Sequence, residues 1–269
     1  MLLRNTQRVQ IRRAAQYGSG VKPFLLIATR GDERVAAEEH ASYCRLTGLL
    51  PEDLEWRRIE SAPLGEVDLD RYSGIILAGS PFTVSEPEAN KSPEERRVER
   101  ELAELLDRVI ERDFPFLGIC YGIGTIGTHQ GAVVDRTFGE TTQATRISLT
   151  PEGLSDPLIG ELPAEFDAFV GHKEAIAEAP PHLTVLASSP GCPVQAFRVG
   201  RNVYATQFHP ELDAGSMSSR VRAYSNHGYF DPAELDLLIE RINAADVRAS
   251  HLVLARFIEQ YLTQAVPSS

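Results

Sequence analysis

Short apolar runs alternate with polar or amphipathic segments along the first half of the chain. Residues 24–28 form an apolar run typical of a buried strand, and residues 34–46 follow with helical spacing before Gly48 can end the helix. A weaker strand is predicted at residues 54–59 and a stronger one at residues 74–78. This order predicts successive strands connected by helices or loops.

The alternation continues with an amphipathic, charged helix at residues 93–112 and an apolar strand from Phe116. Strands and helices at these spacings predict an α/β fold, in which an open, mostly parallel sheet is covered by helices on both faces. Ligands bind such sheets beyond the carboxyl ends of the strands. Gly79, Cys120 and His209 each follow a predicted strand at that end, so we expect the site there.

The rest of the chain adds shorter elements to this plan. Four β-like pieces predict antiparallel additions to the sheet: residues 144–149, 166–170, 183–187 and 194–199. Helical patterns at residues 232–242 and 249–262 are expected to cover a sheet face. Residues 1–22 carry arginines with little apolar periodicity and are predicted to be a flexible extension, with a targeting or partner-binding arm as the alternative. We expect residues 23–269 to form a single domain.

Composition and charge narrow the functional class. The formal charge of −11 and the isoelectric point near 5.2 argue against a general nucleic-acid or anionic-membrane surface. Three cysteines are too few and too scattered for a disulfide framework, and no apolar run approaches the roughly 20 residues that span a bilayer. A cytoplasmic location without membrane or nucleic-acid partners is the expectation.

The run Gly118-Ile119-Cys120-Tyr121-Gly122 is the most informative motif in the chain. A residue on a tight turn from strand to helix displays its side chain above the sheet, and the flanking glycines remove Cβ atoms that would clash there. The following helix start favours a reactive thiolate. Cys120 is therefore predicted to be a nucleophile rather than an inert buried thiol, whereas Cys44 and Cys192 lack this setting.

His209-Pro210-Glu211 supplies the remaining parts of a thiol-based acyl-transfer site. His209 ends a predicted strand, and Glu211 can reach back to orient its ring, whereas the other histidines that we considered lack such a partner. Backbone N–H groups of Tyr121 and of the loop at residues 79–81 are candidate donors for the oxyanion of a tetrahedral intermediate.

The chain resembles the class I glutamine amidotransferases, and in particular the glutaminase domains of GMP synthases. The resemblance covers residues 23–213. Five segments occur in the family's order: residues 79–81, 118–122, 138–140, 171–174 and 207–211. It implies the flavodoxin-like fold of that family.

What the resemblance implies is a cysteine attack on the side-chain amide of glutamine, release of ammonia and hydrolysis of a γ-glutamyl thioester. Cys120 would be the nucleophile, His209 the base and acid, and Glu211 the residue that orients His209. By the same resemblance, Ser80 and Tyr121 would donate backbone N–H groups to the oxyanion.

The resemblance also implies a substrate site, with two departures from the family. Gly79, Gly171 and His172 would lie where the substrate is held. Gly124 occupies the position, four residues after the nucleophile, where the family usually has a glutamine that helps hold the substrate. Ser80 stands in a loop that is usually Gly-Gly-Pro. These departures predict an altered substrate pocket beside an unaltered Cys120, His209 and Glu211.

Three functions remain open at this level. The first is a glutamine amidotransferase that passes ammonia to a separate synthetase subunit or releases it, since no phosphate-binding loop of a synthetase follows residue 213. The second is a γ-glutamyl hydrolase or peptidase acting on a larger γ-glutamyl compound. The third is a regulatory binding subunit. No cofactor is expected, and the histidines and cysteines lack metal-ligand spacing.

Overall fold

The computed structural model describes residues 22–224 and 232–262. The predicted extension at residues 1–22 lies outside the described residues except for Lys22. Within the described residues, no helix is long and apolar enough to cross a membrane.

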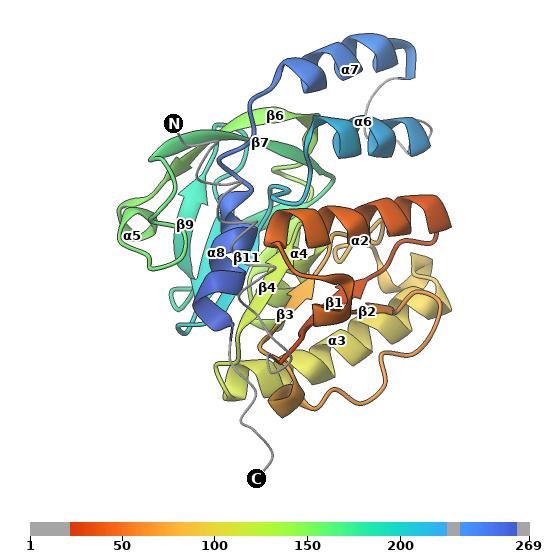
Figure 1. Ribbon diagram of the computed structural model, residues 1–269, viewed down its shortest axis with the longest axis vertical. Coiled ribbons are helices and arrows are strands. Elements are labelled where there is room, and N and C mark those ends of the chain that lie inside the picture. Colours follow the sequence, from red (N-terminus) through yellow and green to blue (C-terminus); the bar gives the residue numbers. More distant parts are fainter. Residues whose placement is uncertain (1–21, 225–231, 263–269) are drawn as a thin grey trace.

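A nine-stranded mixed sheet organises the described part of the chain (Figure 1). One half is parallel, and its strands lie side by side in the order β2 (Leu54–Arg58), β1 (Phe24–Ala28), β3 (Gly74–Leu77), β4 (Phe116–Ile119) and β11 (Val203–Thr206). The other half is antiparallel and continues through β10 (Ala196–Val199), β9 (Thr184–Ser188), β6 (Glu140–Leu149) and β7 (Glu165–His172). A small separate sheet pairs β5 (Val133–Asp135) with β8 (Ala175–Glu178). The predicted α/β class and the antiparallel additions are confirmed.

Alternating side chains of the buried strands create a core on each face of the sheet. Phe24 and Leu26 of β1 face one core, and Leu25 and Ile27 face the other. The first core is covered by α2 (Glu33–Thr47) and α8 (Leu252–Tyr261), and the second by α3 (Pro93–Glu111) and α4 (Tyr121–His129). Both faces are thus apolar, which explains why these strands read as continuous hydrophobic runs.

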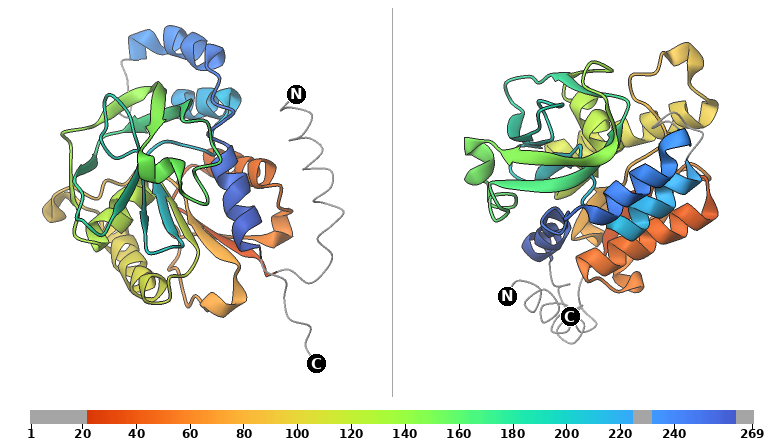
Figure 2. Two further views of the ribbon diagram at one scale, coloured as in Figure 1. Left: turned by 90° about the vertical axis from the view of Figure 1, so that its left-hand side faces the viewer. Right: turned by 90° about the horizontal axis from the view of Figure 1, so that it is seen from above.

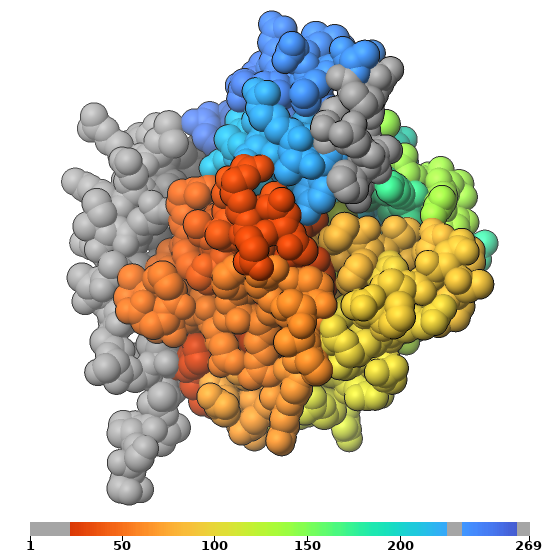
Figure 3. All heavy atoms as spheres, turned by 90° about the vertical axis from the view of Figure 1, so that its right-hand side faces the viewer, coloured from red at the N-terminus to blue at the C-terminus, as the bar shows by residue number. Residues whose placement is uncertain are grey.

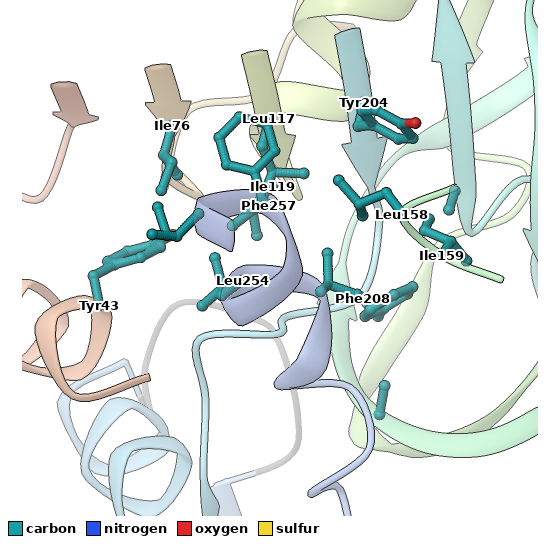
Figure 4. Packing of buried hydrophobic residues seen from close by; sticks show 14 of the residues in the cluster. Tyr43, Ile76, Leu117, Ile119, Leu158, Ile159, Tyr204, Phe208, Leu254 and Phe257 are labelled. Atoms are coloured by element: carbon teal, nitrogen blue, oxygen red, sulfur yellow. The ribbon is translucent and has the colours of Figure 1, made fainter. Parts of the chain in front are cut away.

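Figure 4 shows how the first core packs between the sheet and the helices that cover it. Tyr43 from α2 and Leu254 and Phe257 from α8 point toward Ile76 and Leu117 on the strands. All five side chains are fully buried, and the burial of each of the four without a hydroxyl group contributes about 1.5–3 kcal/mol to the stability of the folded state. The core fixes the strands that carry the site.

Local signals in the sequence set the ends of the predicted helices. Asp32 caps α2 at its start by accepting a hydrogen bond from Val35 N, and Gly48 ends the helix in the left-handed conformation with φ of 74°. Ser92 and Glu95 form a reciprocal capping box at the start of α3. Both helices therefore lie within one residue of their predicted bounds.

The C-terminal region differs from the prediction. Of the two predicted helices, α8 packs on the main sheet, whereas α7 (Leu235–Ala244) packs against α6 (Ala214–Ala223) and the edge of β6. The right-hand view of Figure 2 shows α2, α6 and α7 side by side, and Figure 3 shows α6 next to α2 on the surface. Helix α6 was not predicted because it buries only Met217 and Val221, which is too weak an apolar pattern to recognise.

Candidate active site

Cys120 lies on a sharp turn between β4 and α4. Its backbone has φ of 54° and ψ of −88°, a conformation that is strained for a residue other than glycine. Its N–H donates to Thr206 O at 2.7 Å, which ties the turn to the end of β11. A Cβ at Gly118 would lie 2.7 Å from Ile126 Cδ1 and 2.9 Å from the carbonyl of Gly122. Strand and helix can approach this closely only because residue 118 is glycine.

His209 and Glu211 follow β11 and lie beside this turn. Glu211 Oε1 accepts a hydrogen bond from His209 Nδ1 at 2.8 Å, and the two side chains are 0% and 6% exposed, respectively. The backbone around them is fixed, since His209 N donates to Phe169 O and Ser42 Oγ donates to Glu211 O. The structure thus brings together Cys120, His209 and Glu211.

The charges around His209 favour its protonated form. Burial by itself disfavours the imidazolium, but the charges of Glu211 and Cys120 outweigh it and raise the pKa of His209 to about 9. Burial likewise disfavours the Glu211 carboxylate, yet His209 and Arg220 outweigh it and lower the pKa of Glu211 to about 2. At neutral pH the pair is an imidazolium beside a carboxylate.

Two arginines and a second carboxylate extend this pair into a buried network. Arg220 of α6 donates from Nη1 to Glu211 Oε1 at 3.1 Å and from Nη2 to Glu39 Oε1 at 2.8 Å. Glu39 of α2 also accepts a hydrogen bond from Arg30 Nε at 3.0 Å. The network joins α2 and α6 to Glu211 behind His209, and no local pattern indicates this link because Glu39 and Arg220 are far apart in the chain.

The predicted oxyanion donors lie on the rim of the same site. Ser80 and Tyr121 both line a pocket that contains Cys120, and neither backbone N–H donates a hydrogen bond within the described part of the chain. A Cβ at Gly79 would lie 3.2 Å from His209 Cε1 and 3.5 Å from Cys120 Cβ. Gly79 therefore lets the loop after β3 approach the thiol.

Cys120 lines two pockets. Both are lined by Cys120, Ser80 and Gly171. The first, named here the Glu174 pocket, is lined in addition by the following residues: Phe82, Thr83, Tyr121, His172, Lys173, Glu174 and Gln207. The second, named the Arg30 pocket, is lined in addition by the following residues: Arg30, Pro81, Thr142, His209, Leu212, Met217, Arg220, Val221 and Tyr224.

The predicted substrate residues fall in or beside the Glu174 pocket. Gly171 and His172 line it, whereas Gly124 lies behind its wall. A Cβ at Gly124 would lie 3.3 Å from Val84 Cγ2 and 3.4 Å from Glu174 Oε1. The space beside residue 124 is thus occupied by Val84 and by Glu174, a residue that the sequence placed in a motif without giving it a role.

Glu174 connects this pocket to the loop that carries Ser80. Its two carboxylate oxygens accept hydrogen bonds from Val84 N and Ser85 N, each at 2.7 Å. In the same pocket, Gln207 Nε2 lies 3.9 Å from Cys120 Sγ. The sequence placed Gln207 in a motif without giving it a role, and only the fold shows that its side chain faces the thiol.

A second group of cysteine, histidine and glutamate lies behind the Glu174 pocket. Ligand atoms of Glu140, His172 and Cys192 all lie within 4.8 Å of one another. His172 Nε2 is 3.0 Å from Glu140 Oε2, which also accepts a hydrogen bond from Gln195 Nε2. The expectation that only His209 has a carboxylate partner is wrong. His129 Nε2 lies 3.0 Å from Asp107 Oδ1, and β6 brings Glu140 to His172 across the antiparallel pair.

The two groups differ in access to substrate. Cys192 is fully buried, and burial raises the pKa of its thiol to about 12, whereas Cys120 faces both pockets. Spacing in the sequence could not reveal that Glu140, His172 and Cys192 meet. His172 Nε2 and Gln195 Nε2 already engage Glu140 Oε2, and His172 Nδ1 contacts Glu174 O at 2.9 Å. The group is therefore suited to fixing the backbone at residues 171–174.

Comparison with known proteins places this site in a family. The family model "Glutamine amidotransferase class-I" matches residues 49–224. A glutamine-hydrolysing GMP synthase of Pseudomonas putida (strain W619) is 30% identical over 154 residues, which are 55% of this chain and 27% of the relative. One subunit of the glutamine-hydrolysing GMP synthase of Thermoplasma acidophilum is 32% identical over 147 residues, which are 54% of this chain and 66% of that relative.

A solved structure agrees on the fold. A glutamine amidotransferase from Thermotoga maritima superimposes with a TM-score of 0.71 at 20% identity, covering 89% of this chain and 98% of that one. The matches to curated relatives span about a quarter of the full-length GMP synthase and two thirds of the Thermoplasma subunit. Because the family model covers well over half of the chain, the protein belongs to the class I glutamine amidotransferases.

Proposed function

We propose that the protein hydrolyses the side-chain amide of glutamine through a thioester on Cys120 and releases ammonia. The observation that carries this proposal is the position of Cys120 on a strained turn between two pockets, beside a His209–Glu211 pair joined at 2.8 Å. Family membership supports glutamine as the substrate and favours this function over a γ-glutamyl hydrolase or a regulatory subunit.

The geometry supports a role for each side chain. The Cys120 thiolate attacks the amide carbon of glutamine, and the N–H groups of Ser80 and Tyr121 hold the resulting oxyanion. His209, held as imidazolium by Glu211, donates its proton to the departing ammonia. The neutral imidazole then removes a proton from the water that attacks the thioester, and the thiolate and imidazolium are restored.

The Glu174 pocket is the proposed place for the amino-acid end of glutamine. It lies next to the oxyanion donors and is bordered by the segment at residues 171–174, which the Glu140 and His172 pair supports from behind. Glu174 closes the pocket by holding the backbone of Val84 and Ser85. The loop and the strand end that face the substrate are thus tied to each other.

A labelling experiment with matched cysteine variants tests the proposal. The parent protein should release ammonia from glutamine and should be labelled on one cysteine by a thiol-reactive glutamine analogue, with the adduct located by mass spectrometry. Cys120→Ala should abolish both, whereas Cys44→Ala, which removes a half-buried thiol that lines neither pocket, should keep both. Ammonia release by Cys120→Ala at the parental rate would disprove the proposed nucleophile.

The fate of the ammonia is a separate part of the proposal. The Thermoplasma acidophilum relative is named as one subunit of a GMP synthase, which supports a separate synthetase as the partner of this chain. Ammonia release should be measured with and without a candidate synthetase. Stimulation by the synthetase and its substrates supports a partner, and equal rates in both conditions argue for release of free ammonia.

A further inference from the structure

Arg30 has a side chain that is 6% exposed, yet it lines the Arg30 pocket beside Cys120 and His209. Within the described residues, its only side-chain hydrogen bond is the one from Nε to Glu39. Among these residues, the Nη edge of the guanidinium thus has no hydrogen-bond acceptor, although it lies at a buried position. A buried guanidinium in this state favours an anionic ligand, and a carboxylate matches its planar donors best.

The unoccupied edge of Arg30 lies close to the reacting atoms. The point where a Cβ of Gly79 would stand is 3.3 Å from Arg30 Nη2, 3.2 Å from His209 Cε1 and 3.5 Å from Cys120 Cβ. The side chains of Arg30, His209 and Cys120, which come from separate segments, therefore meet beside Gly79. A ligand carboxylate on Arg30 would hold a neighbouring atom of the same ligand within reach of a group carried by Cys120.

The rest of the pocket is suited to a small organic ligand. Leu212, Met217 and Val221 provide apolar wall, and the ring of Tyr224 lies 5.8 Å from the Arg30 guanidinium carbon. The negative charge of Glu39 compensates one of the two positive charges of Arg30 and Arg220. The Glu211 carboxylate is engaged by His209 and Arg220. The pocket thus combines one accessible cationic edge, an apolar wall and the ring of His209.

We propose that the Arg30 pocket binds an α-amino acid as acceptor of the γ-glutamyl group, so that the protein also catalyses γ-glutamyl transfer. This activity rests on the proposed function, since it starts from the same Cys120 thioester. Arg30 holds the acceptor carboxylate, and the uncharged amine attacks the thioester carbon. A C–N bond forms as the C–S bond breaks, the electron pair stays on the sulfur, and the proton of the amine passes to His209.

Transfer can be measured with two acceptors that differ only in the proposed anchor. The parent protein, supplied with glutamine, should form a γ-glutamyl product with L-alanine at a saturable rate roughly ten-fold above that with L-alaninol, in which a hydroxymethyl group replaces the carboxylate. Both products are quantified by mass spectrometry beside the ammonia released. Equal transfer to the two acceptors, or no transfer to either, would overturn the inference.

Variants locate the anchor. Arg30→Gln should reduce the ratio of the transfer rate with L-alanine to the rate with L-alaninol to about one. Arg30→Lys should keep part of the preference for L-alanine because the charge remains. Arg34→Gln, which alters an exposed arginine paired with Glu38, should keep the full preference. If Arg30→Gln does not fold, the ratio of the transfer rates to L-alanine and L-alaninol in the parent protein decides whether the inference stands. Absence of ammonia release by the parent defeats the proposed function, whereas release without acceptor preference defeats only the transfer activity.

Discussion

Arg220 donates a hydrogen bond to Glu211 at 3.1 Å and joins the proposed catalytic pair to α6. The same guanidinium binds Glu39 at 2.8 Å, and its side chain is only 12% exposed. Two buried carboxylates therefore share one cation. Loss of that cation would leave Arg30 as the charged partner of Glu39 and His209 as the charged partner of Glu211.

Arg220→Gln should lower the free energy of unfolding by about 1.5–3 kcal/mol, because Glu39 and Glu211 each lose a charged hydrogen bond while Arg30 and His209 remain paired with them. Denaturation in urea measures the loss. The matched control is Arg45→Gln, which alters a half-exposed arginine paired with Asp213 and should change the stability little. Equal losses of unfolding free energy in the two variants would show that the buried network stabilises the protein no more than a surface ion pair does.

Glu211→Gln should lower the pKa of His209 from about 9 toward or below its ordinary value of 6.5, because the charge that opposes desolvation is removed. The titration of the His209 ring followed by NMR measures this pKa. Glu38→Gln, which alters a half-exposed surface carboxylate, is the control and should leave it unchanged. A midpoint near 9 in Glu211→Gln would contradict the assigned role of Glu211.

The same pair should make stability depend on pH at both ends of the range. The raised pKa of His209 gives stability that is fully present below about pH 6.5 and is lost as the pH rises through about 9. The lowered pKa of Glu211 gives stability that is present above about pH 4.5 and is lost as the pH falls toward about 2. Urea denaturation across this range should show both declines, and Glu211→Gln should flatten them. If the stability of Glu211→Gln depends on pH as the stability of the parent does, the His209–Glu211 pair is not the cause of the two declines.

Gly118→Ala should destabilise the protein by about 1–3 kcal/mol, because the new methyl group would meet Ile126 and the backbone of Gly122 at under 3 Å. Thermal unfolding together with labelling of Cys120 tests whether the turn still presents the thiol. Gly31→Ala is the control, since nothing lies within 4 Å of its Cβ position. Unchanged stability and labelling in Gly118→Ala would show that the turn tolerates the methyl group.

Gly124→Gln, which installs the residue usual in the family, should lower rather than raise turnover of glutamine. The added side chain would press on Val84 and displace Glu174 from the loop that carries Ser80. Adding Val84→Ala should recover part of the loss, because the two positions are in contact. A double-mutant cycle on kcat/KM measures this coupling, and additive effects would contradict it.

The sequence alone determined the class of fold and the position of the site along the chain. Buried strands read as apolar runs, and helix caps such as Asp32 and Ser92 act within one turn, so both are visible in neighbouring residues. The elbow at Cys120 and the His209–Glu211 pair are also local patterns. For this reason they could be named before their distances were known.

Only the tertiary structure decided what surrounds these residues. Arg30, Glu39 and Arg220 come from separate segments, and nothing in their spacing shows that they meet behind Glu211. His172 meets Glu140 because of the register of the antiparallel strands β6 and β7. The space beside Gly124 is filled by Val84 from the loop after β3 and by Glu174, which follows β7. Contacts between distant segments arise from packing, so the sequence determined which residues could react and the fold determined what they face.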